Sequence, residues 1–221
     1  LYTAVDGSAQ TLLIPDDVKA TQDYDEGRVK HVKVALSAAM FGSAEAAENG
    51  LAYIHAMAHH QEQTGATFLD INVDEFSLKT EEQKAAMTWL VGAVQNMSPL
   101  PISVDSSDVD VIRAGLEACD SSKVRPMLNS ASLERLDALD LVREHNAEVV
   151  ITAAGESGMP SGTAERVTNA SRMVEAALEK GIPLGHLHVD PLVFPISVDK
   201  EFGLHCLDAI REIRGKYGSE I

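Results

Sequence analysis

Residues 101–130 read PISVDSSDVDVIRAGLEACDSSKVRPMLNS, and this stretch decides which fold the chain can adopt. It holds two apolar segments, 102–104 and 124–128, which are followed by Asp105 and Asn129. The residues between them have the length and pattern of a helix. A strand, a helix and a second strand in this order normally bring the two strands together in parallel. We therefore expect a carboxylate, Asp105, and a carboxamide, Asn129, to stand side by side at one rim of a sheet.

The alternation of strand and helix continues on both sides of this stretch. Strands are predicted at 32–36, 66–73, 102–104, 124–128, 148–153 and 186–189, and helices at 43–63, 80–97, 107–120, 132–145, 164–180 and 199–214. This order predicts a parallel sheet, either a closed barrel or an open doubly wound sheet. An open sheet would commonly carry a glycine-rich first turn, and the sequence contains neither G-x-G-x-x-G nor a P-loop motif.

The positions of polar residues favour the barrel. At or near the C-terminal ends of predicted strands, where barrel enzymes have their active sites, the sequence places Asp70, Asn72, Asp105, Asn129 and Asp190. A (β/α)8 barrel needs eight strands, and six precede what looks like the start of a seventh at the end of the sequence. We therefore predict an α/β fold, a (β/α)8 TIM barrel whose C-terminal strands are absent from this chain.

Composition bounds the size, the location and the partners. The 221 residues can form one α/β domain, which we expect at 32–221, incomplete at its C-terminus and preceded by an extension of unassigned role at 1–31. With 34 acidic and 18 basic residues the formal charge is -16, which disfavours nucleic acid and anionic membranes as partners. No apolar run approaches the ~18 residues of a membrane span, and residues 1–20 lack the pattern of a signal peptide. Because Cys119 and Cys206 are far apart, we expect reduced thiols in a cytoplasmic protein.

The polar strand ends form a set with a definite chemistry. Asp105, Asn129 and Asp190 offer two acceptors and one group that both donates and accepts. A planar heterocycle with an amino-pyrimidinone edge presents N–H donors beside a carbonyl, and such a set can bind it in one plane. A single strand-end Asp could merely cap a loop or helix, but four polar strand ends at one rim favour a ligand site, since unpartnered buried carboxylates are costly.

The histidines and serines indicate no other chemistry. His55 and His59 are one helical turn apart, and His186 and His188 share one side of a strand, but neither pair reproduces a zinc signature such as H-E-x-x-H. We interpret them as solvated or structural and expect no metal ligands in this chain. A nucleophilic serine is also unsupported, because the sequence has no G-x-S-x-G motif.

Four segments carry a resemblance to a known family: LDINV at 69–73, VDSS at 104–107, MLNSAS at 127–132 and VDPL at 189–192. In this order and spacing they resemble the pterin-binding barrels of the dihydropteroate synthase-like type, and within them the methyltetrahydrofolate:corrinoid (cobalamin) methyltransferases. The resemblance implies that Asp105, Asn129 and Asp190 bind the pterin ring. Asp70 and Asn72 match a recurrent motif and are further candidates for substrate binding.

The resemblance also implies a reaction and partners. The expected reaction transfers a methyl group between N5 of methyltetrahydrofolate and the cobalt of a corrinoid (cobalamin) on a partner protein. A tertiary amine is a poor leaving group, so N5 needs a proton or a strong hydrogen bond as the C–N bond breaks. Asn129 and Asp105 could share that developing charge as the catalytic residues, without a covalent intermediate. Homodimers are implied as well.

Two departures from the family pattern leave alternatives open. The family's first strand reads G-E-R-I-N, and aligning it with residues 34–38 puts Ala35 and Ala38 in place of the Glu and Asn. The family also has a G-L-S-N segment on the seventh strand, and this sequence ends before that segment would appear. One alternative is thus a pterin-binding subunit that lost catalysis. Another is a dihydropteroate synthase-like enzyme, although PLVFPI after Asp190 lacks the Lys that such enzymes carry there. A lyase or aldolase is disfavoured because no Lys ends a predicted strand.

Overall fold

The computed structural model describes residues 1–120 and 122–221, and its centre is an all-parallel sheet of five strands. In spatial order these are β3 (Leu69–Asn72), β4 (Ile102–Asp105), β5 (Met127–Ala131), β6 (Glu148–Thr152) and β7 (Leu187–Asp190). The strands are followed by α5 (Thr80–Val94), α6 (Val109–Ala118), α7 (Ala138–Glu144), α8 (Thr163–Glu179) and α9 (Glu201–Tyr217), with a short 3-10 turn (Leu184–His186) before β7.

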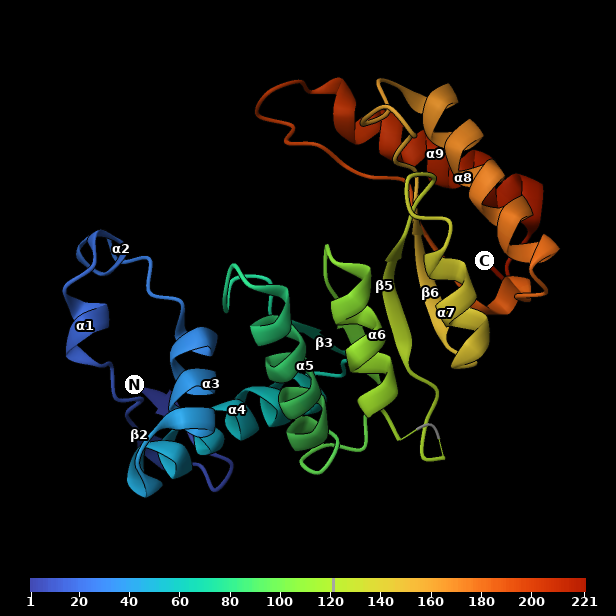
Figure 1. Ribbon diagram of the computed structural model, residues 1–221. Helices are drawn as coiled ribbons and strands as arrows, with labels where there is room; N and C mark the ends of the chain where they lie inside the picture. Colours follow the sequence, from blue (N-terminus) through green and yellow to red (C-terminus); the bar gives the residue numbers. More distant parts are fainter. Residues whose placement is uncertain (121) are drawn as a thin grey trace.

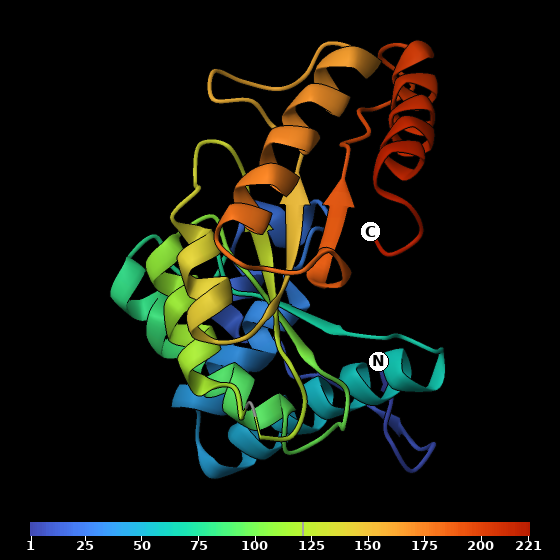
Figure 2. The same ribbon diagram turned by 90° about the vertical axis from the view of Figure 1, so that its right-hand side faces the viewer.

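The spatial order of the strands is also their order in the sequence, which identifies the sheet as part of a barrel. A doubly wound sheet would reverse its order at a switch point and carry helices on both faces. Here α5, α6, α7 and α8 lie along one face of the strands (Figures 1 and 2). The sheet is also curved, because the ring of Phe68, just before β3, lies 6.2 Å from the ring of His188 on β7, measured between ring centroids. The predicted barrel-type fold is therefore confirmed.

The core lies between the strands and the helices that cover them. On β3, Leu69 and Ile71 are buried beneath the helices, whereas Asp70 and Asn72 on the alternate side are exposed. Each buried aliphatic side chain of this kind stabilises the fold by about 1.5–3 kcal/mol. The same alternation leaves the polar side chains of the strands on the concave face.

A close approach of α6 to β4 and α5 depends on Gly115. A Cβ atom at this position would overlap Val104 Cγ1 on β4 and would lie 2.9 Å from Met87 Cγ on α5. Helix α6 can pack this closely against the sheet only because residue 115 has no side chain. Gly115 therefore helps to fix the position of β4, the strand that ends in Asp105.

The strand predicted at 32–36 is wrong, because these residues lie in α3 (His31–Phe41). This helix packs against α4 (Ala44–Gln63), which begins at the predicted N-cap Ser43. The alternating Val and Leu of the segment fit a strand, but the residues that follow are good helix formers and continue a helical pattern. Val34, Ala35 and Leu36 are all buried, which differs from the alternating burial of a half-exposed strand. The alignment of residues 34–38 with the family's first strand is wrong as well, so Ala35 and Ala38 are no sign of lost catalysis.

Several element boundaries also differ from the prediction. Helix α5 starts at Thr80 as predicted but ends at Val94, three residues before the predicted end, and the Thr80 hydroxyl donates to Asp108 Oδ2 at 3.0 Å. Strand β5 begins three residues after the predicted start, directly after Pro126, and it extends to Ala131, so Asn129 lies within the strand. Helix α7 begins only at Ala138, which leaves the preceding residues as a loop at the rim of the sheet.

The N-terminal residues pack against α4. They form a hairpin of β1 (Tyr2–Thr3) and β2 (Ala9–Gln10), followed by the short helices α1 (Asp16–Lys19) and α2 (Gln22–Asp25). Tyr2 meets Tyr53 of α4 edge to face, with ring centroids 5.0 Å apart, and Asn49 of α4 donates to the Thr11 carbonyl at 2.9 Å. In the described part of the chain, no helix is long and apolar enough to cross a membrane.

Candidate functional site

The C-terminal ends of β3, β4 and β5 bring three of the predicted site residues to one level. Asn72 is paired in register with Asp105, and Asp105 with Asn129. The predicted adjacency of Asp105 and Asn129 is thereby confirmed, and Asn72 extends the row by one strand. Asp70 lies two residues before Asn72 on β3, where it is paired in register with Ser103 of β4.

Hydrogen bonds link these side chains into a polar row on the concave face. Asn72 Nδ2 donates to Asp105 Oδ2 at 2.9 Å. Asp70 Oδ1 accepts from Ser103 Oγ at 2.6 Å and from Asn129 Nδ2 at 3.2 Å. Among the described residues, Asp105 Oδ1 and Asn129 Oδ1 accept no hydrogen bond. A donor group of a ligand can therefore reach two neighbouring acceptors at this rim.

The surroundings of Asp105 change its acidity. Its half-buried position raises its pKa above the ordinary value, mainly by desolvation, and the charges of Asp70 and Asp74 act in the same direction. The Asn72 hydrogen bond and the charge of Arg135 oppose the shift without cancelling it. Asp105 thus holds a proton more readily than an ordinary aspartate, which suits a group that shares a proton with a ligand.

Sequence reasoning missed Asp74, which lies in the loop after β3. Its carboxylate accepts from Ser106 Oγ at 2.5 Å and from the Ser107 N–H at 2.9 Å, both in the loop after β4. Burial alone would raise the pKa of Asp74, but these hydrogen bonds and the charge of Arg135 outweigh burial and lower it. The ionised Asp74 carboxylate therefore connects the loop after β3 to the loop after β4 by hydrogen bonds. The signal in the sequence was a third polar residue at every second position, since Asp74 follows Asp70 and Asn72 with the same spacing.

Arg135 was missed too, and it connects the loops after β4 and β5. Its Nη1 donates to the carbonyl oxygens of Ser106 and Ser107 at 3.2 and 3.1 Å, and its Nη2 to Ser130 Oγ at 3.4 Å. Asp74 and Arg135 together hold the two residues that follow Asp105, and Arg135 also contacts the hydroxyl of the residue that follows Asn129. The loops after three consecutive strands are thus one hydrogen-bonded unit.

Asp190 reaches the same edge of the sheet but stands apart from this unit. It ends β7, is paired in register with Thr152, and is exposed. Its Oδ1 accepts from the Leu192 N–H at 2.8 Å. No hydrogen bond joins Asp190 to Asp105 or Asn129 among the described residues, so a ligand that contacts all three would have to span the concave face.

Of the four histidines considered in the sequence, only His188 lies on a strand of the sheet. His188 on β7 lies 2.6 Å from Glu148 on β6, measured from Nε2 to Oε2, and meets Phe68 edge to face. His186 lies in the 3-10 turn before β7, while His55 and His59 lie in α4. Within residues 1–120 and 122–221, no group of three or more His, Cys, Asp or Glu side chains has the arrangement of a metal site.

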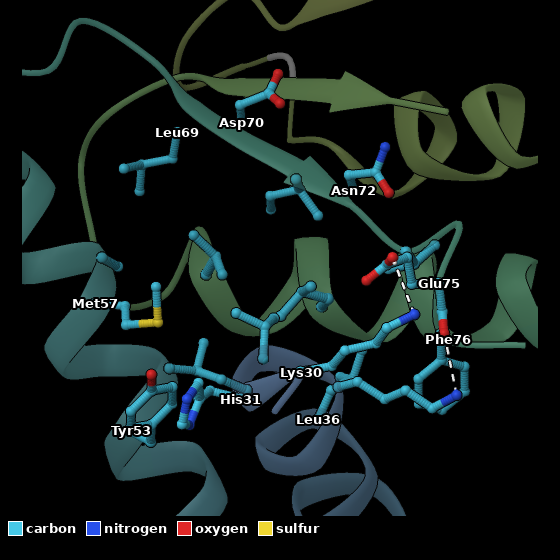
Figure 3. A pocket seen from close by; sticks show the side chains of 18 of the residues that line it. Lys30, His31, Leu36, Tyr53, Met57, Leu69, Asp70, Asn72, Glu75 and Phe76 are labelled. Atoms are coloured by element: carbon cyan, nitrogen blue, oxygen red, sulfur yellow. Dashed lines mark hydrogen bonds and ion pairs between the residues drawn. The ribbon is translucent and has the colours of Figure 1, made fainter. Parts of the chain in front are cut away.

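A cavity of about 560 Å³ lies beside the free edge of β3, and Asp70 and Asn72 of the polar row are among the residues that line it. Apolar side chains of α3, α4, α5 and β3 line most of it. Figure 3 shows Leu69 and Met57 facing the cavity, whereas the side chains of Asp70 and Asn72 lie on the other side of the strand. We place the candidate site at the polar rim because Asp105 and Asn129, which carry the free acceptor atoms of the row, do not line the cavity.

Comparisons with known proteins point in one direction. A family model described as pterin binding enzyme matches residues 41–221. Over 174 residues the chain is 30% identical to methionine synthase of Mycobacterium leprae, with 73% of this chain and 14% of the relative covered. Over 174 residues it is 26% identical to methylcorrinoid:tetrahydrofolate methyltransferase of Eubacterium limosum, with 75% of this chain and 62% of the relative covered. The chain therefore spans less than two thirds of these relatives.

Solved structures agree on the fold. The dihydropteroate synthase from Xanthomonas albilineans in complex with 7,8-dihydropteroate matches with a TM-score of 0.60 at 20% identity, covering 76% of this chain and 61% of that one. The Yersinia pestis DHPS with a pterine-sulfa conjugate matches with a TM-score of 0.56 at 18% identity, covering 74% and 63%. This likeness concerns the fold, and it agrees with the predicted type of barrel.

Proposed function

The chain belongs to the pterin binding enzyme family, and on this premise we propose that it binds a reduced pterin at the C-terminal rim of its sheet. The row of Asn72, Asp105 and Asn129 on three neighbouring strands carries this proposal, because it presents two free acceptor atoms at one level. In the proposed complex Asp105, Asn129 and Asp190 contact the pterin ring, and Asp70 and Asn72 complete the substrate site.

The reaction that we propose is methyl transfer between N5 of methyltetrahydrofolate and the cobalt of a corrinoid. The names of the two relatives, methionine synthase and methylcorrinoid:tetrahydrofolate methyltransferase, support this choice. The corrinoid, carried by a partner protein, would exchange the methyl group with the pterin. The residues of this chain bind and orient the pterin. As the C–N bond breaks, Asp105 and Asn129 stabilise the proton or hydrogen bond at N5, a role that the raised pKa of Asp105 favours.

The family membership also supports a proposal for the domain bounds, the partner, the oligomeric state and the location of the protein. We propose a pterin-binding domain at 32–221 with an N-terminal extension at 1–31. The proposed partner is a corrinoid protein, and the proposed assembly is a homodimer in the cytoplasm. These statements concern the whole protein, whose relatives are longer than this chain.

Calorimetric titration with methyltetrahydrofolate tests the site. We expect Asp105→Ala and Asn129→Ala each to weaken binding about tenfold or more, because a hydrogen bond to a charged or buried ligand group contributes about 1–3 kcal/mol. Asp137→Ala, an exposed Asp before α7 that makes no cap hydrogen bond, is the control and should leave the affinity unchanged. Unchanged affinity in both site variants would refute the assignment.

The alternatives to catalysis by methyl transfer have weak support in this chain. The idea of a binding subunit without catalysis rested on Ala35 and Ala38, which lie in α3 and not in a barrel strand. A dihydropteroate synthase-like activity shares the fold, but the segment after Asp190 lacks the Lys of those enzymes. Methylation of free cob(I)alamin from methyltetrahydrofolate separates the methyltransferase from both alternatives, since only the methyltransferase produces it.

A further inference from the structure

The side chain of Arg166 on α8 is fully buried and joins two loops at the rim of the sheet. Its Nε donates to the Leu192 carbonyl oxygen at 3.0 Å, in the loop after β7. Its Nη1 donates to the carbonyl oxygens of Pro160 and Gly162 at 3.3 and 3.1 Å, in the loop after β6. A single guanidinium group therefore fixes the backbone of both loops.

The charge of Arg166 is unusual for a buried side chain. Among the described residues no carboxylate lies within ion-pair distance, and the neighbouring Glu165 accepts hydrogen bonds from Ser161 instead. Nη2 has no hydrogen-bond partner in the described structure, and the guanidinium carbon lies 4.8 Å from the centroid of the Phe194 ring. Burying a cation without a counterion is costly, and an apolar side chain would fill the space more cheaply. Packing alone therefore does not account for an arginine here.

The hydrogen bond to Leu192 connects Arg166 to the candidate site. Leu192 adopts a φ of 64°, a left-handed conformation that costs a non-glycine residue about 1 kcal/mol or more. In this conformation its N–H donates to Asp190 Oδ1 at 2.8 Å while its carbonyl oxygen accepts from Arg166. Both polar groups of one backbone unit are thus occupied, one by Asp190 and the other by Arg166.

We infer that Arg166 is a positioning residue, which holds Leu192 in its left-handed conformation and so orients the Asp190 carboxylate toward the pterin. This inference rests on the proposed function, because Asp190 is one of the residues proposed to contact the ring. It goes beyond that function by assigning a role to a side chain of α8 that does not touch the ligand. The face of the Phe194 ring stabilises the Arg166 guanidinium by a cation–π interaction.

A double-mutant cycle tests whether Arg166 acts through Asp190. Arg166→Lys keeps the charge but loses the fork that binds three carbonyl oxygens. We expect it to weaken methyltetrahydrofolate binding about tenfold in the natural background and by less than about threefold in an Asp190→Asn background. Arg172→Lys on the same helix, an exposed residue paired with Glu156, is the control and should not change the affinity. Equal losses in the two backgrounds would overturn the inference.

A second measurement needs no pterin. In Arg166→Lys, hydrogen exchange of the Leu192 amide should accelerate about tenfold or more, while amides in the middle of β6 keep their protection. Unchanged exchange at Leu192 would overturn the inference even if folate binding fell. If the natural protein does not bind methyltetrahydrofolate, the proposed function fails, and Leu192 exchange still decides whether Arg166 holds the loop. Should Arg166→Lys not fold, Arg166→Gln replaces it in both measurements, because it also loses the fork that binds the three carbonyl oxygens but buries no charge.

Discussion

At the scale of single residues, two carboxyl groups of the rim have pKa values displaced in opposite directions. The pKa of Asp105 is raised, mainly by burial, and that of Asp74 is lowered, because its hydrogen bonds outweigh burial. A raised carboxyl pKa in the folded state means that the fold prefers the protonated form, so ionised Asp105 destabilises it. An ionised Asp74 is instead favoured by the fold.

Asp105→Asn should therefore raise the thermal melting temperature at neutral pH. The gain should shrink as the pH falls through the raised pKa of Asp105 and vanish below the ordinary value of 3.8. Asp74→Asn is the matched comparison and should lower the melting temperature at neutral pH, with the loss disappearing only as the pH falls through its lowered pKa. Melting curves across the acid range check both, and a parallel response of the two variants would contradict the assignment.

Arg135 allows the charge at the rim to be separated from its hydrogen-bond geometry. Arg135→Met removes the cation near Asp105, so the pKa of Asp105 should rise further, as a carbon-13 titration of its carboxyl group would measure. Arg135→Lys keeps a cation and should leave that pKa closer to the natural one, yet lose the bridge from Ser106 to Ser130. Both should weaken folate binding. Identical titrations in the two variants would show that charge has no part in the effect.

At the scale of elements, the contact of α6 with β4 sets the position of Asp105. Gly115→Ala should destabilise the protein by about 1–3 kcal/mol, since the added methyl group overlaps Val104 and Met87. Gly92→Ala on α5 is the control, because its methyl group would meet no atom within 4 Å and alanine favours a helix. Urea unfolding measures both. A Gly115→Ala variant as stable as the natural protein would mean that α6 can move away from β4.

The elements also show which parts of the fold the sequence could predict. Strands β3, β4, β6 and β7 lie within or close to their predicted bounds, because each is a short apolar run bounded by turn residues. The segment at 32–36 was misread because its spacing fits both a strand and a helix, and only packing against α4 decides between them. Pro126 was the missed boundary, since a proline interrupts a central strand and β5 starts directly after it.

The candidate site was predictable in its strand-end residues but not in its loops. Asp105 and Asn129 could be paired because parallel neighbours align their ends. The diagonal contact of Asn129 with Asp70 depends on the register between strands, which no local pattern encodes. Arg135 lay inside the helix predicted at 132–145, and it reaches the rim because α7 begins only at Ala138, which leaves Arg135 in the loop after β5.

At the scale of the whole molecule, the five strands form part of a barrel wall with a polar concave face. The resemblance expected from four short motifs is confirmed by the match to the pterin binding enzymes over residues 41–221. The first strand of the expected series is not in this sheet, since its residues form α3. The side of β3 away from β4 consequently has no strand partner among the described residues.

That unpaired side of β3 has a consequence for how the protein behaves in solution. An open strand edge exposes a row of N–H and carbonyl groups, which can pair with an extended segment of another molecule. Here the edge faces a cavity with apolar walls, so a pairing segment could also bury its side chains. At the margin of that cavity, Lys30 Nζ lies 3.0 Å from Glu75 Oε1 (Figure 3). Lys33 Nζ donates to the Glu75 carbonyl oxygen at 3.1 Å. Charged side chains beside an open strand edge disfavour pairing with strands of other molecules. We expect Lys30 and Lys33 to have this effect at the C-terminal end of β3.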